Sequence, residues 1–270
     1  MNIIDLLKNN AKKYPSKIGF IDEEKEITFQ NLLNKVKIFS SSELFENKNE
    51  VVGLVLDNSI EDIISYLGII YAGKIAHIIP PKITEKNFVN QIQSSNPSAI
   101  ICSKKNQKNF LDFNTKNIPI FNDEQVISKS IIDFENRKNN KIAYLIYTSG
   151  TTSEPKGVPI SHEMIEFTTK NIVNVLGYSK NDINLTPLPI YHSFGLGCLH
   201  TSIYVGSTFV LLKNANNLEN VLNSLKKFDA TTFAAVPVTL TKFLKFEKQY
   251  LEEKFSNIRL IITNSTSIPK

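Results

Sequence analysis

Residues 148–157 combine hydroxyl side chains, glycines and a lysine in an order that suits the binding of an anion. The segment reads Thr-Ser-Gly-Thr-Thr-Ser-Glu-Pro-Lys-Gly and directly follows the apolar run at 142–147. Backbone N–H groups freed by Gly150, the surrounding hydroxyls and the Lys156 ammonium group could together enclose a triphosphate. The segment is neither a Walker A loop, which needs Gly-Lys followed by Ser or Thr, nor a G-x-G-x-x-G loop. On composition alone, an ordinary polar surface loop is the alternative.

The order of the residues from Tyr147 to Val158 closely resembles the phosphate-loop signature of the AMP-binding, adenylate-forming superfamily, Y-T-S-G-T-T-G-x-P-K-G-V. This superfamily includes acyl-CoA synthetases, the adenylation domains of nonribosomal peptide synthetases, and luciferases. The sequence departs from the signature at Ser153, where the family has glycine and where a serine at positive φ would cost about 1–2 kcal/mol. The resemblance implies that the phosphates of ATP, with Mg²⁺, are bound by Thr148, Ser149, Gly150, Thr151, Thr152, Ser153, Glu154, Pro155 and Lys156.

Other segments resemble the same family in the same order along the chain. In the last of them Asn264, Ser265 and Thr266 stand where the family has the Gly-Gly-Ala that lies against the adenine. The resemblance assigns these three residues, together with Tyr191, to the adenine and substrate pocket. The segments that carry the resemblance are 26–36, 71–81, 184–197, 206–212, 231–240 and 258–269.

Later motifs of the family do not occur in the sequence. These are Y-G-x-T-E, the ribose-binding aspartate and the C-terminal catalytic lysine. We therefore expect residues 1–270 to form the N-terminal portion of an AMP-binding (adenylation) domain, without the C-terminal part of that domain and without the small C-terminal domain.

His192 lies in the segment Pro-Ile-Tyr-His-Ser-Phe-Gly (189–195), which resembles the family's pocket segment L-P-x-x-H-x-x-G. In the family, a histidine or aromatic residue at this position borders the substrate carboxylate and controls access of the thiol, so the resemblance assigns His192 a catalytic role. No Asp or Glu between 183 and 217 could pair with a substrate ammonium group, whose burial without a partner would be costly. The segment therefore predicts a fatty or aryl acid rather than an amino acid.

The other histidines are expected to have structural roles or none. His77 lies in a strand-like run and is expected in the core, whereas His162 is expected to begin a helix that Ser161 caps. His200 is assigned no role. Because the histidines lack the spacing of metal ligands, no residue is assigned to a metal.

Short apolar runs typical of buried strands alternate with helical patterns along the chain. This alternation predicts an α/β fold with mainly parallel sheets flanked by helices. Ligands of such sheets bind at the carboxyl ends of the strands, so the loops after 147, 187 and 263 are expected to form the site. The predicted strands are 17–21, 26–29, 51–56, 75–80, 98–102, 142–147, 207–212, 231–236 and 259–263, and the clearest helices are 31–38, 60–71, 84–94 and 161–177.

Composition and charge exclude several classes of protein. The net charge is +5, but the lysines are spread along the chain and only two arginines occur, which disfavours nucleic-acid binding. No apolar run approaches the roughly 18 residues that a membrane span needs, and Asp5 interrupts the N-terminal stretch where a signal peptide would be apolar. Cys102 and Cys198 lie in separate apolar segments and are predicted to be core residues. We expect a cytoplasmic protein.

Taken with the resemblance, these features predict an acyl-CoA ligase-like enzyme. It would join a carboxylic acid to ATP as an acyl-adenylate, and a complete enzyme would then form a thioester with CoA or a carrier thiol. ATP, Mg²⁺ and CoA are the implied cofactors, and a carboxylate substrate or an acyl carrier protein the implied partners. Two alternatives stay open: a non-catalytic remnant that binds nucleotide or acyl groups, and one half of a split adenylating enzyme.

Overall fold

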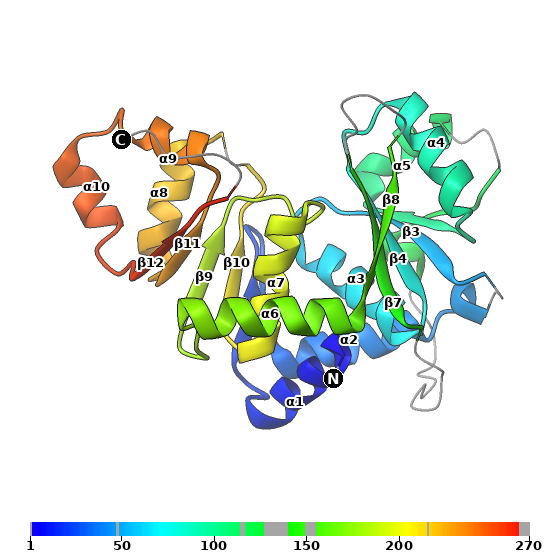
Figure 1. Cartoon of the computed structure of the whole chain (residues 1–270), viewed down its shortest axis with the longest axis horizontal. Coiled ribbons are helices and arrows are strands. Elements are labelled where there is room, and N and C mark those ends of the chain that lie inside the picture. Colours follow the sequence, from blue (N-terminus) through cyan, green and yellow to red (C-terminus); the bar gives the residue numbers. More distant parts are fainter. Residues whose placement is uncertain are drawn as a thin grey trace.

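The strands form two sheets, which we call sheet A and sheet B (Figure 1). The structure is a computed structural model that describes residues 2–46, 49–113, 117–126, 140–148, 155–214 and 216–264. Within these residues each sheet has six strands, in the order β12-β11-β9-β10-β1-β2 in sheet A and β6-β5-β3-β4-β7-β8 in sheet B. The predicted class, mainly parallel sheets flanked by helices, is confirmed.

Sheet A combines strands from the two ends of the described chain. Its hairpin β1–β2 is antiparallel, and its other pairings are parallel. In the pairing of β1 with β10, Phe20 lies opposite Phe209, and their rings meet edge to face at 6.3 Å between centroids. The strands are β1 (Ile18–Ile21), β2 (Glu26–Thr28), β9 (Ile183–Thr186), β10 (Thr208–Leu211), β11 (Thr232–Ala234) and β12 (Leu260–Ile262).

Sheet B is built from one uninterrupted part of the sequence. Its strands are parallel except for the last pair, β7 and β8, which is antiparallel. Every residue of β4 is buried, and in β3 all residues after Val51 are buried, as the continuous apolar run at 51–56 predicted. The strands are β3 (Val51–Val55), β4 (Ile75–Ile79), β5 (Ile100–Cys102), β6 (Ile120–Asn122), β7 (Ile142–Tyr147) and β8 (Gly157–Ser161).

Helices fill the space between the sheets and cover their outer faces. The largest apolar cluster joins α1, α2, α3 and α7, which contribute the fully buried Leu7, Leu32, Leu67 and Leu199. Figure 1 shows α6 running across the front of the molecule from the end of β8 toward sheet A. The helices are α1 (Ile3–Lys13), α2 (Phe29–Ser40), α3 (Ile60–Tyr71), α4 (Glu85–Ser95), α5 (Lys104–Phe113), α6 (His162–Leu176), α7 (Ser193–Val205), α8 (Leu218–Lys227), α9 (Pro237–Phe243) and α10 (Lys248–Lys254), with short 3₁₀ turns η1 (Glu43–Glu46) and η2 (Asp123–Val126).

Local capping explains where two of the predicted helices begin. At α3, the Ser59 hydroxyl accepts a hydrogen bond from the Asp62 N–H and the Asp62 carboxylate accepts one from the Ser59 N–H, at 3.1 and 2.9 Å. At α6, the Ser161 hydroxyl accepts the N–H of Met164 at 3.1 Å, which confirms the predicted cap and places His162 at the first helical position.

Arg259 joins the amino ends of β9 and β12. Its guanidinium group donates two hydrogen bonds of 2.7 Å to the Asp182 carboxylate, which is buried, and a third of 3.0 Å to the carbonyl of Gly177. Burial raises the pKa of Asp182, but hydrogen bonds from Arg259, the Ser179 N–H and the Thr231 hydroxyl outweigh that effect and hold the pKa below its usual value.

Several described elements, among them α1, β6, α5 and β8, are not among those that the sequence predicted. Residues 104–113 form α5, although the polar stretch there predicts no element; the helix buries only Phe110 and so lacks a wide apolar face. Residues 157–161 form β8, although the loop before them was expected to lead straight into a helix; the strand is mostly exposed and contains Pro159, which suits the edge of a sheet.

The two cysteines differ in how deeply they are buried. Cys102 is buried as predicted, whereas Cys198 is only partly buried. Burial raises the pKa of both thiols to about 12, so neither is activated as a thiolate. Among the described helices, none has the length and apolar character required to cross a membrane.

Candidate active site

The segment between β9 and α7 carries His192 at the carboxyl edge of sheet A. His192 is the residue before the first turn of α7, and its N–H donates to the Pro189 carbonyl at 3.1 Å. Its ring lies 4.5 Å from the ring of Tyr191 and makes no capping hydrogen bond to the helix. The side chain is exposed, yet the neighbouring atoms displace enough water to lower its pKa from 6.5. The imidazole is therefore mainly neutral at pH 7 and can both donate and accept a hydrogen bond.

The close approach of α7 to the Pro189 carbonyl explains why this segment has a glycine, Gly195, three residues after His192. A Cβ atom at Gly195 would lie 2.3 Å from the carbonyl oxygen of Pro189 and 2.8 Å from its carbonyl carbon. Backbone atoms cannot give way as a flexible side chain can, so the first turn of α7 can lie this close to Pro189 only without a side chain. The glycine thus fixes how α7 meets the segment that precedes it.

The expected phosphate loop connects β7 to β8. The sequence predicts this loop between a strand and a helix, and the structure corrects that, since β8 intervenes before α6. The Thr148 N–H donates to the Lys156 carbonyl at 3.2 Å and closes the base of the loop, and both residues are exposed. Pro155 is partly buried. The other residues predicted to bind phosphate, Ser149, Gly150, Thr151, Thr152, Ser153 and Glu154, lie outside the described residues.

Close packing below the loop holds its base in place. A Cβ atom at Gly157 would lie 2.9 Å from the Cζ atom of Tyr147, so the tyrosine ring lies directly over the glycine. On its other side the ring packs at 4.8 Å from the ring of His77, which is fully buried and hydrogen-bonds to Gln91 and Ser95 at 3.2 and 2.9 Å. His77 is thus a core histidine, as predicted, and both of its ring nitrogens have hydrogen-bond partners; burial lowers its pKa to about 4.

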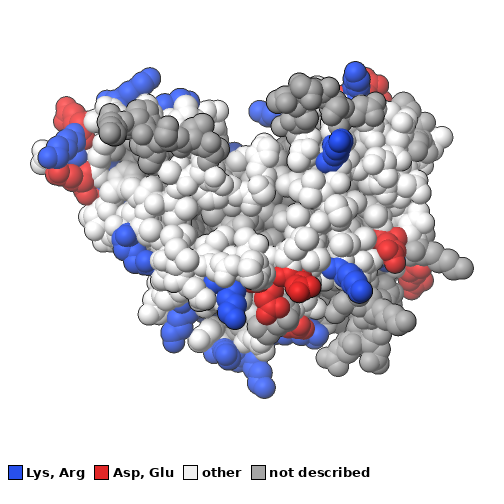
Figure 2. Space-filling model, in the orientation of Figure 1, with Lys and Arg blue, Asp and Glu red and all other residues white. Residues whose placement is uncertain are grey.

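The described part of the expected adenine and substrate pocket is small. Asn264 follows β12 and is exposed, and Tyr191 is half-buried, whereas Ser265 and Thr266 lie outside the described residues. The carboxyl ends of β7, β9 and β12 all face the upper side of the molecule in Figure 1. Figure 2 shows the surface hollowed between the two parts of the molecule on this side, and the visible walls of the hollow carry few charged side chains.

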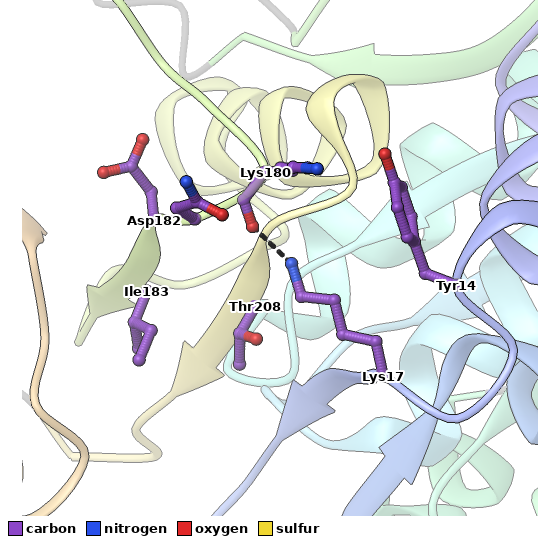
Figure 3. A pocket seen from close by; sticks show the side chains of 7 residues that line it. Tyr14, Lys17, Lys180, Asp182, Ile183 and Thr208 are labelled. Carbon is purple, nitrogen blue, oxygen red and sulfur yellow. Dashed lines mark hydrogen bonds between the residues drawn. The ribbon is translucent and has the colours of Figure 1, made fainter.

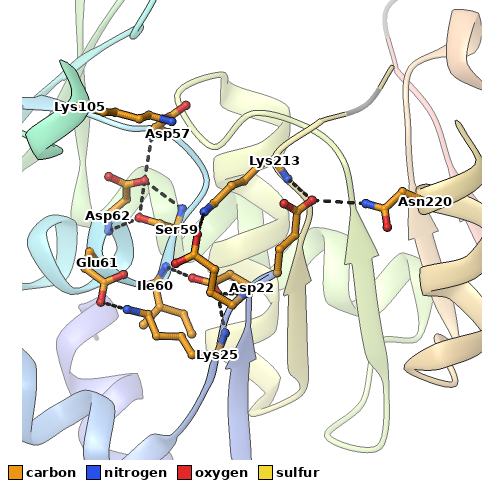
Figure 4. Close-up of polar contacts among 12 residues, drawn as sticks. Asp22, Lys25, Asp57, Ser59, Ile60, Glu61, Asp62, Lys105, Lys213 and Asn220 are labelled. Atoms are coloured by element: carbon orange, nitrogen blue, oxygen red, sulfur yellow. Dashed lines mark hydrogen bonds and ion pairs between the residues drawn. The ribbon is translucent and has the colours of Figure 1, made fainter. Parts of the chain in front are cut away.

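The structure brings Asp57 to this region, which the sequence did not predict. Asp57 precedes Asn58, whose amide oxygen accepts the N–H of Ile190 next to Tyr191. Burial raises the pKa of Tyr191, and the charge of Asp57 raises it further. Asp57 forms an ion pair with Lys105 from α5 (Figure 4). No local sequence pattern links the loop after β3 to the segment after β9, because these two strands belong to different sheets.

A separate pocket lies at the opposite, amino edge of sheet A. It has a volume of about 400 Å³ and is lined by Tyr14, Lys17, Lys180 and Asp182, among others (Figure 3). The Lys17 ammonium group donates to the backbone carbonyls of Lys180 and Gly206. This charge is therefore already paired with carbonyl groups that precede β9 and β10.

His200 also has an internal partner. Its Nε2 atom lies 2.8 Å from the hydroxyl of Tyr66, and both side chains are buried. Burial lowers the pKa of His200 to about 3, so it stays neutral within the core. Among the described residues, no group of three or more His, Cys, Asp or Glu could hold a metal ion.

The chain is similar to several known proteins in sequence and in fold. The chain is 25% identical over 238 residues to a 2-succinylbenzoate--CoA ligase of Staphylococcus epidermidis, which covers 87% of this chain and 48% of the ligase. It is 24% identical over 274 residues to gramicidin S synthase 2 of Brevibacillus brevis, which covers 97% of this chain and 6% of that protein. The structure of the anthranilate CoA ligase AuaEII in complex with anthranoyl-AMP superposes with a TM-score of 0.86 at 23% identity, covering 100% of this chain and 55% of that one.

The chain matches only part of the length of each of these relatives. The chain spans about half the length of the 2-succinylbenzoate--CoA ligase, and its similarity to the solved structure concerns the fold. The residue pattern of the AMP-binding enzyme family, in contrast, matches residues 7–270 and therefore almost the whole chain. The protein belongs to the AMP-binding enzyme family.

Proposed function

We propose that this chain binds the phosphates of ATP with its β7–β8 loop and activates a carboxylic acid, fatty or aryl, as an acyl-adenylate. The observation that supports this most is the loop itself, which carries the family's phosphate signature and whose base is closed by the Thr148–Lys156 hydrogen bond. His192 and Tyr191 follow β9 at the carboxyl edge of the neighbouring sheet and would border the acid. The residues from Ser149 to Glu154 are included in the proposal on the sequence signature alone.

In the proposed reaction, a carboxylate oxygen attacks the α-phosphorus of ATP. A carbon–oxygen–phosphorus link forms, the bond from the α-phosphorus to the bridging oxygen breaks, and pyrophosphate leaves with that electron pair. The chain would contribute positioning and charge: backbone N–H groups of the loop and the Lys156 ammonium group would hold the β- and γ-phosphates as negative charge moves onto them. Mg²⁺ would enter as part of MgATP, and no described residue is assigned to it.

The second half-reaction would transfer the acyl group to a thiol of CoA or of a carrier protein. The thiolate would attack the acyl carbon, and AMP would leave with its oxygen. A neutral His192 next to the carboxyl group could donate a hydrogen bond to the developing oxyanion.

Replacing Lys156 with alanine tests the nucleotide site. We expect MgATP binding to weaken by about 1–3 kcal/mol, the usual contribution of a hydrogen bond to a charged group. Isothermal titration calorimetry measures the change, with Lys170→Ala on the exposed face of α6 as a control that leaves affinity unaltered. Equal affinity in Lys156→Ala and the unsubstituted chain would remove Lys156 from the site. Absence of any MgATP binding by the unsubstituted chain would contradict the proposal and favour a remnant that no longer binds nucleotide.

The substrate class follows from the side chains around His192. Of the apolar side chains in this segment, Ile190 and Leu196 are fully buried in the core, whereas Tyr191 and Phe194 are partly exposed and remain available to an acyl or aryl group. The segment supplies no carboxylate of its own. Asp57, whose charge raises the pKa of Tyr191, already has a positively charged partner in Lys105. An ammonium group buried here would therefore lack a counter-charge.

Two adenylate analogues that differ by one ammonium group test this substrate class. We expect 3-phenylpropanoyl sulfamoyl adenosine to bind at least about tenfold more tightly than the phenylalanyl compound, the ratio that corresponds to 1.4 kcal/mol. Competition against a fluorescent nucleotide measures both affinities. Tighter binding of the aminoacyl compound would overturn the assignment, and if Asp57→Asn abolished that preference, Asp57 would be the counter-charge.

A further inference from the structure

Asn58 occupies an unusual place between the two sheets. It follows β3 of sheet B and adopts a left-handed backbone conformation with φ of 57°, which asparagine tolerates better than most residues. Its side chain is 5% exposed and points toward sheet A. The amide nitrogen donates to the carbonyls of Leu188 and Leu212 at 2.9 and 3.0 Å, and the amide oxygen accepts the N–H of Ile190 at 2.8 Å.

These three hydrogen bonds serve backbone groups that have left the sheet. Leu188 and Ile190 follow β9, and Leu212 follows β10. These residues lie beyond Thr186 and Leu211, the last pair between the two strands. Both N–H groups of the Asn58 amide are in use. An amide that satisfies two carbonyls and one N–H at once fixes the segment in one position, because any shift would leave a buried polar group unpaired.

The loop that carries Asn58 is itself held firmly. Its neighbour Ser59 belongs to the capping box with Asp62, and the Asp57 N–H also donates to the Asp62 carboxylate, at 2.8 Å. From sheet A, the Asp22 carboxylate accepts the N–H of Ile60 at 3.0 Å (Figure 4). Asn58 therefore extends from a loop that is tied both to the start of α3 and to sheet A.

The backbone then leads directly from Asn58 to the candidate site. The Ile190 N–H is bound by Asn58, and the adjacent Pro189 carbonyl accepts the N–H of His192 and contacts Gly195. On the far side of the same segment, the Thr186 hydroxyl accepts the Leu188 N–H at 3.0 Å and donates to the Ala234 carbonyl at 2.9 Å. The segment is thus held from β11 on one side and from sheet B on the other.

We propose that Asn58 is a positioning residue for His192, and that through it the loop after β3 in sheet B sets where the histidine lies at the edge of sheet A. The chemical role of His192 rests on the proposed function. The position of the His192 side chain does not depend on that function. A residue with a purely structural role would lower the stability of the protein when replaced and would leave the surroundings of the His192 ring unchanged.

Two variants distinguish the effect of the Asn58 side chain from the effect of its backbone conformation. Asn58→Gly keeps the left-handed conformation and removes all three hydrogen bonds. Asn58→Asp keeps the acceptor for the Ile190 N–H but sets a carboxylate oxygen against the carbonyls of Leu188 and Leu212. Asn96→Gly is the matched control, because Asn96 is also left-handed, with φ of 44°, but is exposed at the end of α4.

The readout is the proton titration of the His192 ring by NMR, with the signal assigned from His192→Gln. In both Asn58 variants we expect the titration midpoint of His192 to rise toward its unperturbed value, because the ring moves away from the neighbouring atoms that lower its pKa in the unsubstituted chain. In Asn96→Gly it should stay unchanged. An unchanged His192 titration in folded Asn58 variants would overturn the proposal.

A further measurement uses the unsubstituted chain and therefore does not depend on whether a variant folds. The Ile190 N–H, whose acceptor is the Asn58 side chain, should exchange with solvent deuterium at least about a hundredfold more slowly than an exposed amide, as buried hydrogen-bonded groups do. Exchange at the rate of an exposed amide would contradict the inference. Neither readout uses a ligand, so failure of the chain to bind MgATP would count against the proposed function and not against the role of Asn58.

Discussion

Replacing Gly195 with alanine is expected to destabilise the protein by about 1–3 kcal/mol and to move His192 from its place at the start of α7. The added methyl group would lie 2.3 Å from the Pro189 carbonyl oxygen, and backbone atoms there can yield only if the whole segment shifts. The same carbonyl accepts the His192 N–H, so a shift must also alter the histidine. Urea unfolding measures the loss of stability, and the NMR titration of His192 measures the displacement.

Gly197, in the same helix, provides a matched control for this substitution. A Cβ atom at Gly197 would have no neighbour within 4 Å. Gly197→Ala should therefore stabilise the protein by up to about 1 kcal/mol, since alanine favours a helix more than glycine does. If both substitutions had equal effects on unfolding, the close approach of α7 to Pro189 would not be the reason for the glycine.

Replacing Arg259 with methionine is expected to cost about 2–3 kcal/mol of stability. The substitution leaves the buried Asp182 carboxylate without its bidentate partner, and breaking such a pair is usually costlier than this. The expected loss is reduced because the Arg259 side chain is 41% exposed and because Ser179 and Thr231 still donate to the carboxylate. Lys248→Met, which removes an exposed i,i+4 pair with Glu252, should change stability by less than about 0.5 kcal/mol.

The pH dependence of unfolding gives an independent view of the same pair. Because the pKa of Asp182 is lower in the folded state, its contribution is fully present above the unfolded value of 3.8 and is lost as the pH falls through the folded value. Urea unfolding between pH 5 and pH 2, taken as approximate limits of this range, should therefore show a smaller loss of stability in Arg259→Met than in the unsubstituted protein. Parallel pH profiles would show that the ion pair does not set the pKa of Asp182.

The sequence predicted the elements whose local pattern matches their final surroundings. The continuous apolar run at 51–56 contains the strand β3, because a strand covered on both faces needs mostly apolar side chains. The cap at Ser161 could be predicted because its partner is three residues away. Helix α5 and strand β8 could not be predicted in this way, since most of their residues face solvent and leave no periodic apolar signal.

The contacts that shape the candidate site join distant parts of the chain, and no local pattern records them. The sequence around Asn58 indicates a helix cap, and its neighbour Ser59 is indeed the cap, but the bonds of Asn58 to Leu188 and Leu212 cross between sheets. The glycine at 195 belongs to a motif, yet its reason is a carbonyl at Pro189 that only the fold brings close. Sequence patterns therefore predicted which segments form the site better than how they are held together.

The pairing of β1 with β10 has a consequence for the order in which the protein can assemble. All strands of sheet B come from residues 51–161, so their partners are close to one another in synthesis as well as in space. Phe20, in contrast, meets Phe209 across sheet A. At about 5–20 residues per second, the ribosome needs on the order of ten to forty seconds to make the chain between them. During that interval β1 has an open hydrogen-bonding edge, and a nascent chain that stops before β10 leaves the edge exposed to other chains. In the sequence, the strands of sheet B thus lie between the first two strands of sheet A and its other four strands. These two parts of sheet A are therefore synthesised at different times.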